Sequence, residues 1–286
     1  MDFKVFFQEN FFMSLFTVDS EKCAQDGICA ETCPMQIIAF SGAGEPPIPT
    51  PEADALCINC GHCVASCPTG ALSLSTMKTE DCPAIDTEQL ISPEQAAQFI
   101  RSRRSIRKYT DQKVDRQLLL KLIEIASYAP SGHNSQPVGW RVIYDSEQVL
   151  HLAGVVIDWM RHVIVNQPDL AGSLNMERLV SAWESGNERI CRGAPHVVIA
   201  HAPKENRAAP AACTIGLSYL ELTASAFGLG ACWGGYFNAA SNLWQPMKDA
   251  LELPDEHVSY GALMIGYPRY AYYRIPFRNA PDISWK

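Results

Sequence analysis

The sequence has little basic charge and no long uninterrupted apolar segment near its start. Its 286 residues carry 31 Asp and Glu against 23 Lys and Arg, a net charge of −8. Because nucleic-acid affinity depends on neutralising phosphates, this balance argues against a dedicated nucleic-acid binder. The Phe-rich segment 1–16 is broken by Lys4, Gln8 and Glu9, so it lacks the apolar run of a secretory signal peptide. We therefore expect a cytoplasmic protein, and both Met1 and Met13 are open as its natural start.

No segment is convincing as a membrane span either. The longest weakly charged run, 213–237, contains one charged residue, Glu221. A span needs about 20 mostly apolar residues, so the length alone would allow one. However, Thr, Ser and Gly interrupt the run, and the glycines in 228–235 are typical of a helix that ends in a tight loop. We expect a buried core helix here and no membrane partner.

Charge and cysteine are distributed unevenly along the chain. Residues 1–92 hold 13 acidic and 3 basic side chains, whereas residues 93–286 hold 18 and 20. Eight of the 11 cysteines lie between Cys23 and Cys82. Two modules of different chemistry are therefore expected. We predict an N-terminal extension over 1–16, a cysteine-rich domain over 17–76, a linker over 77–91 and a second domain over 92–286.

The second domain alternates predicted helices and strands. Ser92, Pro93 and Gln95 have the spacing of a capping box with proline in the first helical position, and Asp115 is expected to cap another helix. Strands are predicted over 138–144, 196–201 and 259–267, and helices over 146–165, 210–227 and 243–251, with an extended tail from Pro268. This alternation indicates an α+β fold, a mixed sheet layered with helices. In the first domain, Pro and Gly over 42–51 predict a loop without helix or strand.

The strongest motif is Cys57-x2-Cys60-x2-Cys63-x3-Cys67-Pro68. Three thiolates at this spacing can converge on three corners of an iron–sulfur cubane, and the fourth cysteine, followed by proline, is directed to the other cluster of two-cluster proteins. A zinc site usually joins two Cys-x2-Cys pairs across a longer gap. In a reducing cytosol these thiols are expected to bind metal rather than to form disulfides.

An earlier motif, Cys23-x5-Cys29-x3-Cys33-Pro34, has the same frame, with Asp26 at the position of the second cysteine. Over residues 17–76 the chain therefore resembles the bacterial two-cluster ferredoxins. The resemblance implies two iron–sulfur clusters of the 4Fe–4S type. Their ligands would be Cys33, Cys57, Cys60 and Cys63 for one cluster and Cys23, Cys29 and Cys67 for the other, with Asp26 beside its fourth iron.

Asp26 leaves two interpretations open. A carboxylate is a harder ligand than a thiolate and holds iron less tightly in a sulfide-rich cluster, so Asp26 would mark a labile corner that interconverts between 4Fe–4S and 3Fe–4S. Alternatively, Asp26-Gly27 is simply a turn. Cys82 lies outside both motifs and is expected to be a free thiol.

Four further segments lie in a suggestive order along the second domain. Residues 101–121 contain eight basic side chains, a pattern that alone is typical of a solvated face. A polar loop over 128–137 follows, then a Gly-rich segment over 228–235 whose backbone can approach a ligand closely, and an aromatic, basic tail. In this order they resemble the FMN-dependent nitroreductase family over residues 93–286.

This second resemblance implies which residues bind FMN. Planar guanidinium groups suit a phosphate monoester, and no nucleophile elbow surrounds Ser131, so we assign binding residues and no catalytic residue. The implied groups are Arg103, Arg104, Ser105 and Arg107 at the phosphate and pyrimidine edge; Pro130, Ser131, Gly132, Asn134 and Gln136 from the partner subunit; Trp233, Gly234 and Gly235 near the reactive N5 edge; and Arg274 and Arg278 on the phosphate.

The combined resemblances imply a homodimeric flavin-dependent oxidoreductase with FMN at the subunit interface. Two iron–sulfur clusters would exchange electrons with FMN, and FMN would reduce a nitroaromatic, quinone or enone. NAD(P)H or a reduced ferredoxin would be the donor, and the direction of electron flow is open. The alternative is a non-catalytic electron carrier or redox sensor in which FMN serves as a relay.

Overall fold

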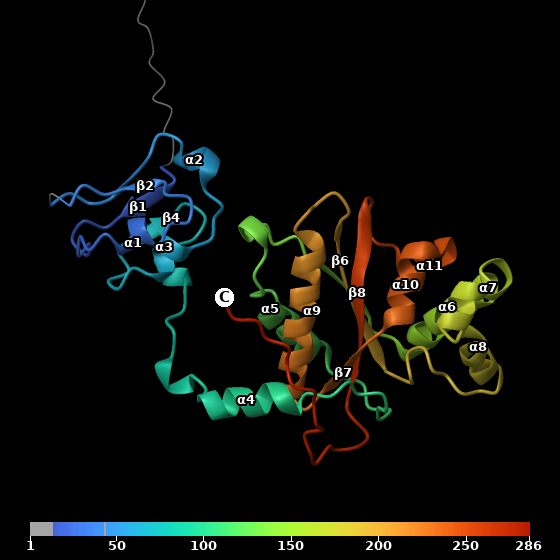
Figure 1. The fold of residues 1–286 in the computed structure, drawn as a ribbon. Helices are drawn as coiled ribbons and strands as arrows, with labels where there is room; N and C mark the ends of the chain where they lie inside the picture. The colour runs from blue at the N-terminus through green and yellow to red at the C-terminus, as the bar shows by residue number, and fades with distance from the viewer. Residues whose placement is uncertain (1–13, 43) are drawn as a thin grey trace, which may run out of the picture. The chain divides into compact units, whose positions relative to one another are not determined.

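The structure, a computed structural model, describes residues 14–42 and 44–286. Met13 and most of the expected N-terminal extension lie outside the described residues. The chain divides into two compact units, residues 1–90 and 91–286, whose elements are labelled in Figure 1. The division falls close to residue 92, where the charge balance of the sequence changes.

The first unit contains two small antiparallel sheets and short helices. β1 (Phe16–Val18) pairs with β4 (Leu72–Leu74), and β2 (Ile38–Ala39) pairs with β3 (Ile48–Pro49). The helices are α1 (Ile28–Glu31), α2 (Ala53–Leu56) and α3 (His62–Ala65), followed by the 3-10 turns η1 (Thr79–Asp81) and η2 (Thr87–Gln89). Because β3 lies inside 42–51, the expectation that this segment holds no strand is wrong: a two-residue edge strand tolerates Pro49.

The two cysteine motifs adopt the same local backbone. α1 follows Gly27, with φ 73° and ψ 0°, and α3 follows Gly61, with φ 71° and ψ 5°. Both glycines lie in the left-handed region, which other residues adopt only with strain. Asp26 and Cys60 precede these glycines, so they occupy equivalent positions in the two repeats.

The second unit is built on a four-stranded sheet with the order β5-β6-β8-β7. Its strands are β5 (Gly139–Ile143), β6 (His196–Pro203), β7 (Gly230–Trp233) and β8 (His257–Gly266). All three pairings among these described strands are antiparallel, so the sheet is not mixed in the sense of parallel and antiparallel pairs. The α+β class and the layering of helices on the sheet are confirmed.

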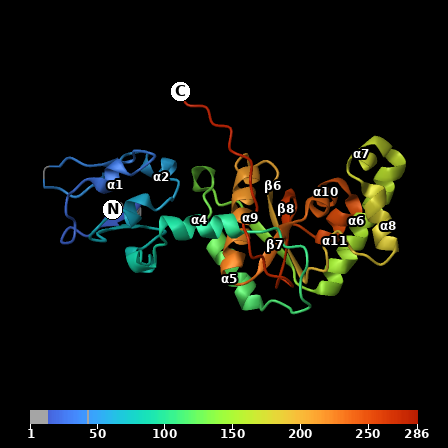
Figure 2. The same cartoon turned by 60° about the horizontal axis from the view of Figure 1, so that its bottom comes forward.

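Helices cover both faces of this sheet (Figures 1 and 2). α5 (Arg116–Ala126) and α9 (Ala209–Ala226) lie on one face, and α6 (Ser146–Asn166), α10 (Gly235–Leu243) and α11 (Gln245–Leu251) lie on the other. The remaining helices are α4 (Pro93–Ser102), α7 (Pro168–Ser173), α8 (Met176–Glu184) and the 3-10 turn η3 (Gly132–Asn134). Along β6, Val198 packs with the α5 and α9 layer and Val197 packs with the α6 layer, as strand alternation requires.

Most predicted elements are confirmed. Ser92 and Gln95 form the expected capping box on α4, and the Asp115 side chain caps α5. The predicted strands correspond to β5, β6 and β8. β7 and α10 were not predicted, because their glycines indicate a loop when read without the neighbouring strand β8.

Among the residues that the structure describes, one helix, α6, is long and apolar enough to cross a membrane. Eight of its side chains are buried, and they belong to the hydrophobic core between α6 and the sheet. The run 213–237, which the sequence singles out, is instead divided among α9, β7 and α10. The prediction of a core helix in this run is confirmed by the buried side chains of α9.

The stability of the second unit is expected to depend on pH through His201. Burial, with the neighbouring charges of His257 and Arg141, lowers the pKa of His201 to about 4. In the unfolded chain this histidine takes up a proton near pH 6.5, whereas in the folded chain it does so only near pH 4. The free energy of unfolding is therefore highest above pH 6.5 and falls as the pH drops toward about 4. The expected slope is up to ~1.4 kcal/mol per pH unit. Denaturant titrations of His201→Gln should show a shallower acid decline than wild type, and equal declines would contradict this assignment.

Candidate functional site

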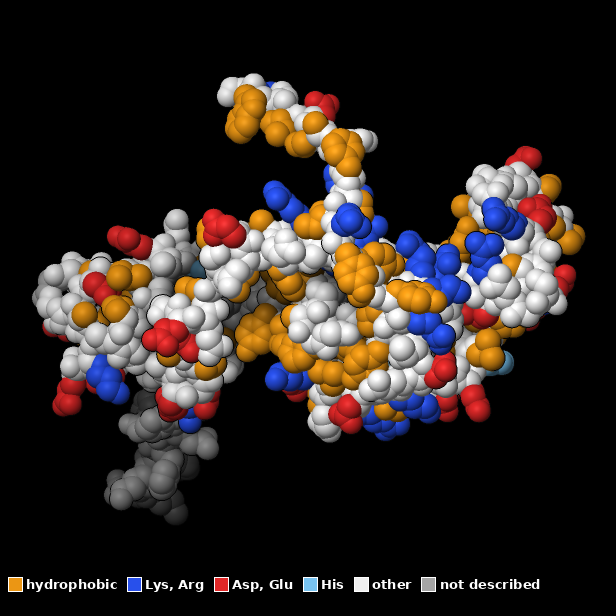
Figure 3. Space-filling view, turned by 90° about the horizontal axis from the view of Figure 1, so that it is seen from below, with side chains coloured by type: hydrophobic (Ala, Val, Ile, Leu, Met, Phe, Trp, Pro, Cys, Tyr) orange, Lys and Arg blue, Asp and Glu red, His pale blue; other side chains and the backbone are white. Residues whose placement is uncertain are grey.

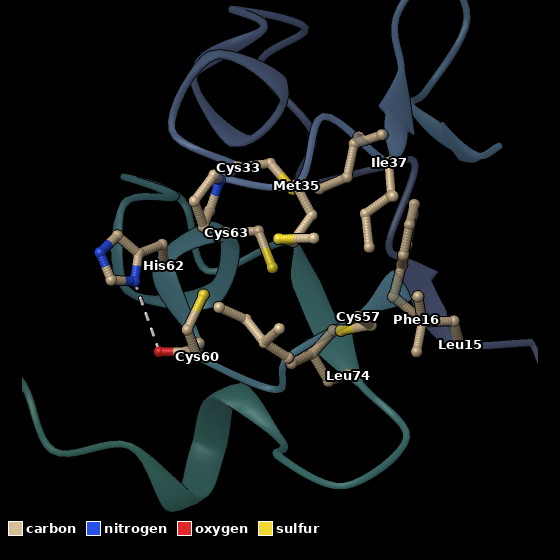
Figure 4. A pocket seen from close by; sticks show the side chains of 14 residues that line it. Leu15, Phe16, Cys33, Met35, Ile37, Cys57, Cys60, His62, Cys63 and Leu74 are labelled. Atoms are coloured by element: carbon tan, nitrogen blue, oxygen red, sulfur yellow. Dashed lines mark hydrogen bonds between the residues drawn. The ribbon is translucent and has the colours of Figure 1, made fainter. Parts of the chain in front are cut away.

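One cavity of the first unit is lined by four thiols. They belong to Cys33, Cys57, Cys60 and Cys63, the set that the ferredoxin resemblance implies for one cluster. Figure 4 shows Cys60 and Cys63 pointing into the cavity, whereas the His62 ring faces the Cys60 carbonyl, 3.5 Å from its Nδ1. The apolar part of the wall comes from Leu15, Phe16, Met35, Ile37, Ile38 and Leu74. The lining therefore combines soft sulfur ligands with apolar side chains that exclude water.

The remaining thiols form a second group. Burial raises the pKa of Cys29, and the neighbouring thiols of Cys67 and Cys23 raise it further. In the first group, burial raises the pKa of Cys63 to about 11, with added contributions from Cys33 and Cys60. The electrostatic neighbours of each buried thiol thus come from its own implied cluster.

Backbone amides donate hydrogen bonds to two of these sulfurs. The Ala71 N–H lies 3.2 Å from Cys67 Sγ, and the Asn59 N–H lies 3.4 Å from Cys57 Sγ. Burial would raise the pKa of Cys67, but its hydrogen bonds with Thr69 and Ala71 outweigh burial and lower the pKa. Such bonds favour a ligating thiolate and tune the potential of an iron–sulfur cluster.

The arrangement fits clusters better than single metal ions. Within residues 14–42 and 44–286, no three His, Cys, Asp or Glu side chains are placed to share one ion. A structural zinc site needs its ligands about 2.3 Å from a single centre, whereas each cysteine of a cubane binds its own iron. Four thiols around one cavity therefore match the donor set of a cluster.

Asp26 lies at the surface, at the start of α1. Its Oδ1 accepts a hydrogen bond from the Ile28 N–H at 3.1 Å, which is the contact that the turn interpretation predicts. Its backbone position is equivalent to that of Cys60, which the ligand interpretation requires. The structure places Asp26 where both interpretations need it, and iron ligation stays a prediction.

In the second unit, the basic segment 103–107 lies beside β7. The Ile106 N–H donates to the Ala231 carbonyl at 2.9 Å. A Cβ on Gly230 would lie 2.3 Å from the Ile106 side chain, so only glycine permits this approach. These contacts with β7 hold the backbone of the segment in place and so position its arginines.

Arg103 and Arg104 line a cavity at the end of α9. Its other polar or aromatic lining residues are Phe99, Ser102, Glu221, Ser225, Tyr270 and Tyr272. The Arg104 guanidinium lies 5.8 Å from the Tyr272 ring centroid. Its Nε is buried and makes no hydrogen bond among the described residues. An unpaired buried cationic donor beside a cavity is what an anionic oxygen would satisfy, so these residues fit a phosphate-bearing cofactor.

The other two predicted residues of the basic segment lie next to this cavity wall. Ser105 is half-buried, and its Oγ lies 3.5 Å from Arg103 Nη1. Arg107 is exposed, and its Nη1 donates to the Ser105 carbonyl at 3.4 Å. The structure therefore brings the four residues into one continuous patch.

Glu221 joins this patch to the Gly-rich turn. Its buried carboxylate accepts from Arg103 Nη1 at 2.8 Å and from Trp233 Nε1 at 3.2 Å. No sequence motif assigns Glu221 to this site. The sequence feature that points to it is that Glu221 is the one charged residue of the apolar run 213–237. A carboxylate in such a helix needs a partner when it is buried.

The polar loop lies at a different cavity. Ser131 and Gln136 line it, together with Trp140, Ala212 and Gly216. The Gln136 N–H donates to Ser131 Oγ at 2.9 Å, and its Nε2 donates to Asn134 Oδ1 at 3.2 Å. His133, Asn134 and Gln136 have φ of 51°, 51° and 44°, a strained conformation that clusters at functional sites. Within one chain the structure does not bring this loop, including Pro130 and Gly132, to the arginine cavity.

The Gly-rich turn and the tail complete the predicted set. Trp233 ends β7 and is 37% exposed, Gly234 donates to the Ala262 carbonyl at 2.8 Å, and Gly235 begins α10. Arg274 and Arg278 are exposed on the C-terminal segment, and neither lines the arginine cavity. Figure 3 shows this segment extending from a face where Lys and Arg side chains gather.

Comparison with known proteins identifies both parts of the chain. Residues 100–267 match the sequence model of the nitroreductase family, and residues 22–72 match that of the 4Fe-4S dicluster domain. A relative from Methanothermobacter thermautotrophicus, named as an NADH dehydrogenase/NAD(P)H nitroreductase, is 21% identical over 183 residues. The match covers 62% of this chain and 80% of the relative.

Solved structures share the fold of the second unit. A nitroreductase with bound FMN from Bacteroides fragilis superposes with a TM-score of 0.57 and 18% identity, covering 66% of this chain and 97% of that chain. A second, from Desulfitobacterium hafniense, also with bound FMN, gives 0.53 and 20%, covering 68% and 99%. Because the family match spans more than half of the sequence, the chain belongs to the nitroreductase family.

Proposed function

We propose that this protein is a flavin-dependent oxidoreductase whose two iron–sulfur clusters exchange electrons with FMN. The observation that carries the proposal is that one chain combines a four-thiol cavity with a cavity that presents a buried, unpaired Arg104 Nε. The first is suited to a 4Fe–4S cluster and the second to a phosphate. The solved relatives that share the fold of the second unit hold FMN, which favours FMN as the phosphate-bearing group.

In this proposal Arg103 and Arg104 bind the phosphate and the pyrimidine edge of FMN. Their positive charge favours the negatively charged, reduced state of a flavin, and so tunes its potential. When bound, FMN supplies the exchange between one-electron carriers and a two-electron acceptor. The protein holds the cofactor with its arginines and with the backbone of 233–235.

We further propose a homodimer in the cytoplasm, with FMN at the interface. Support comes from the loop 130–136, which lies at a separate cavity of the same chain, and from the tail, where Tyr273, Phe277 and Trp285 are exposed. Large apolar side chains grouped at a surface mark interaction sites. Sedimentation of the FMN-loaded protein is expected to show a dimer, and a monomer would contradict this part of the proposal.

The proposed acceptors are nitroaromatics, quinones or enones, and the donor is NAD(P)H or a reduced ferredoxin. The names of the curated relatives, NADH dehydrogenase/NAD(P)H nitroreductase, support a nicotinamide donor. The ferredoxin-like unit supports a one-electron protein donor. The test is anaerobic turnover of the holoprotein against panels of these acceptors. Rapid exchange with ferredoxin but no turnover of any acceptor would favour an electron carrier instead.

We also propose that Asp26 makes its cluster labile. EPR of anaerobically prepared protein is expected to show a 3Fe–4S signal on mild oxidation, because a carboxylate holds its iron less tightly than a thiolate. Asp26→Cys is expected to abolish that signal, and Asp54→Cys, at another exposed acid of the same unit, to leave it unchanged. A lasting absence of the signal in wild type and Asp26→Cys alike would overturn the proposal.

A further inference from the structure

A buried carboxylate in the wall of the arginine cavity contacts two segments that are far apart in sequence. Glu221, on α9, is 8% exposed, and each of its oxygens has a separate donor. Oε1 lies 2.8 Å from Arg103 Nη1, and Oε2 lies 3.2 Å from the Trp233 indole nitrogen. Arg103 follows α4 in the basic segment, and Trp233 is the last residue of β7. Glu221 therefore connects the basic segment to the Gly-rich turn.

The two donors are held in a fixed relation by this carboxylate. Arg103 is partly exposed, with 26% of its side chain accessible, whereas only 9% of the Glu221 side chain is accessible. A long arginine side chain loses rotamer freedom when one of its five N–H donors is fixed. The remaining donors then have a defined direction for a ligand oxygen.

Trp233 is restrained from two sides. Its indole N–H is bound to Glu221, and its ring lies so close to β8 that a Cβ on Gly261 would be 3.0 Å from Trp233 Cζ3. More than a third of the residue is nevertheless exposed. Trp233 is therefore a fixed aromatic surface next to the cavity rather than a mobile side chain.

The charge of Glu221 offsets that of Arg103. The Glu221 carboxylate and the Arg103 guanidinium form a neutral pair. Arg104, the other arginine of the cavity wall, has no acidic partner among the described contacts. A full positive charge on Arg103 would favour a reduced, more negative flavin. The paired Arg103 provides less of this stabilisation.

We propose that Glu221 is a positioning residue of the flavin site, which orients Arg103 and Trp233 and keeps the potential of the bound FMN low. The inference rests on the proposed function, since it needs FMN in the arginine cavity. A flavin of low reduction potential is needed to reduce organic acceptors whose own reduction potential is low.

The experiment separates charge from geometry with two variants. Glu221→Gln keeps the size and an acceptor oxygen but removes the charge, so the FMN midpoint potential should become more positive, with affinity changed by no more than a few-fold. Glu221→Asp keeps the charge but withdraws the carboxylate, so FMN should bind at least about tenfold more weakly, with a smaller change in potential. Glu177→Gln, an exposed glutamate on α8, is the matched control for net charge.

Potentials are measured by anaerobic dye-coupled titration, and affinities by fluorescence of released FMN. An FMN-loaded Glu221→Gln with the potential of wild type, or with the same shift as Glu177→Gln, would overturn the proposal. So would a folded Glu221→Asp that binds FMN as tightly as wild type. A wild-type protein that binds no FMN would instead refute the proposed function itself.

Discussion

Replacing Cys60 with serine is expected to lower the iron content of the anaerobically purified protein, because the cluster in the four-thiol cavity loses the thiolate that holds one of its irons. Cys60 points into the four-thiol cavity (Figure 4), and a serine hydroxyl is a harder and poorer iron ligand than a thiolate. The cluster of Cys33, Cys57 and Cys63 would lose one corner. Iron and sulfide analysis, with the visible absorbance of the clusters, measures the loss.

Cys82 provides the matched control. It is another half-buried thiol of the same unit, and its Sγ lies 3.4 Å from the Lys78 carbonyl rather than in the cavity. Cys82→Ser is therefore expected to keep the full iron content. If both variants keep their iron, or both lose it equally, the assignment of Cys60 as a ligand is wrong.

Arg104→Met is expected to weaken FMN binding by roughly 10- to 100-fold, because a hydrogen bond to a charged group contributes about 1.5–3 kcal/mol. The stability of the protein without FMN should not fall, since the substitution removes a buried Nε that has no hydrogen-bond partner among the described residues. Titration of the flavin-free protein with FMN measures the first effect, and thermal denaturation of the same sample measures the second.

Arg116→Met is the control for loss of an arginine from this unit. Arg116 is exposed and stacks 4.5 Å from the Tyr144 ring centroid, and it does not line the arginine cavity. Its substitution is expected to leave FMN affinity unchanged. An Arg104→Met protein with wild-type affinity would show that the phosphate does not bind at Arg104.

The cysteine groups could be predicted from the sequence because their ligand order is encoded locally. A fixed spacing places the thiols of each motif within a few residues of one another, whereas the exchange of Cys33 and Cys67 between the two groups follows from the resemblance to two-cluster ferredoxins. Arg103 to Arg107 also lie in one short segment, but their prediction as FMN-binding residues needed the order of all four segments, since a basic run alone is typical of a solvated face. Local patterns of this kind survive folding because the backbone around them is short and constrained.

What the sequence could not reveal depends on distant contacts. Glu221 binds Arg103 across 118 positions of the chain, and no local pattern encodes such a pair. β7 was not predicted because its glycines are required by contacts with residues distant in sequence. Gly230, for example, leaves room for the Ile106 side chain. The loop 130–136 is likewise uninformative alone, since its proposed ligand belongs to the partner subunit.

The most direct test of electron exchange between the clusters and FMN is anaerobic stopped-flow reduction with the flavin and cluster bands recorded separately. NADH, NADPH and reduced ferredoxin are each mixed with the holoprotein. If the clusters and FMN exchange electrons, one of these donors is expected to reduce both chromophores in sequence, flavin first with a nicotinamide or clusters first with ferredoxin. Full reduction of one chromophore while the other stays oxidised, with every donor, would contradict electron exchange between them.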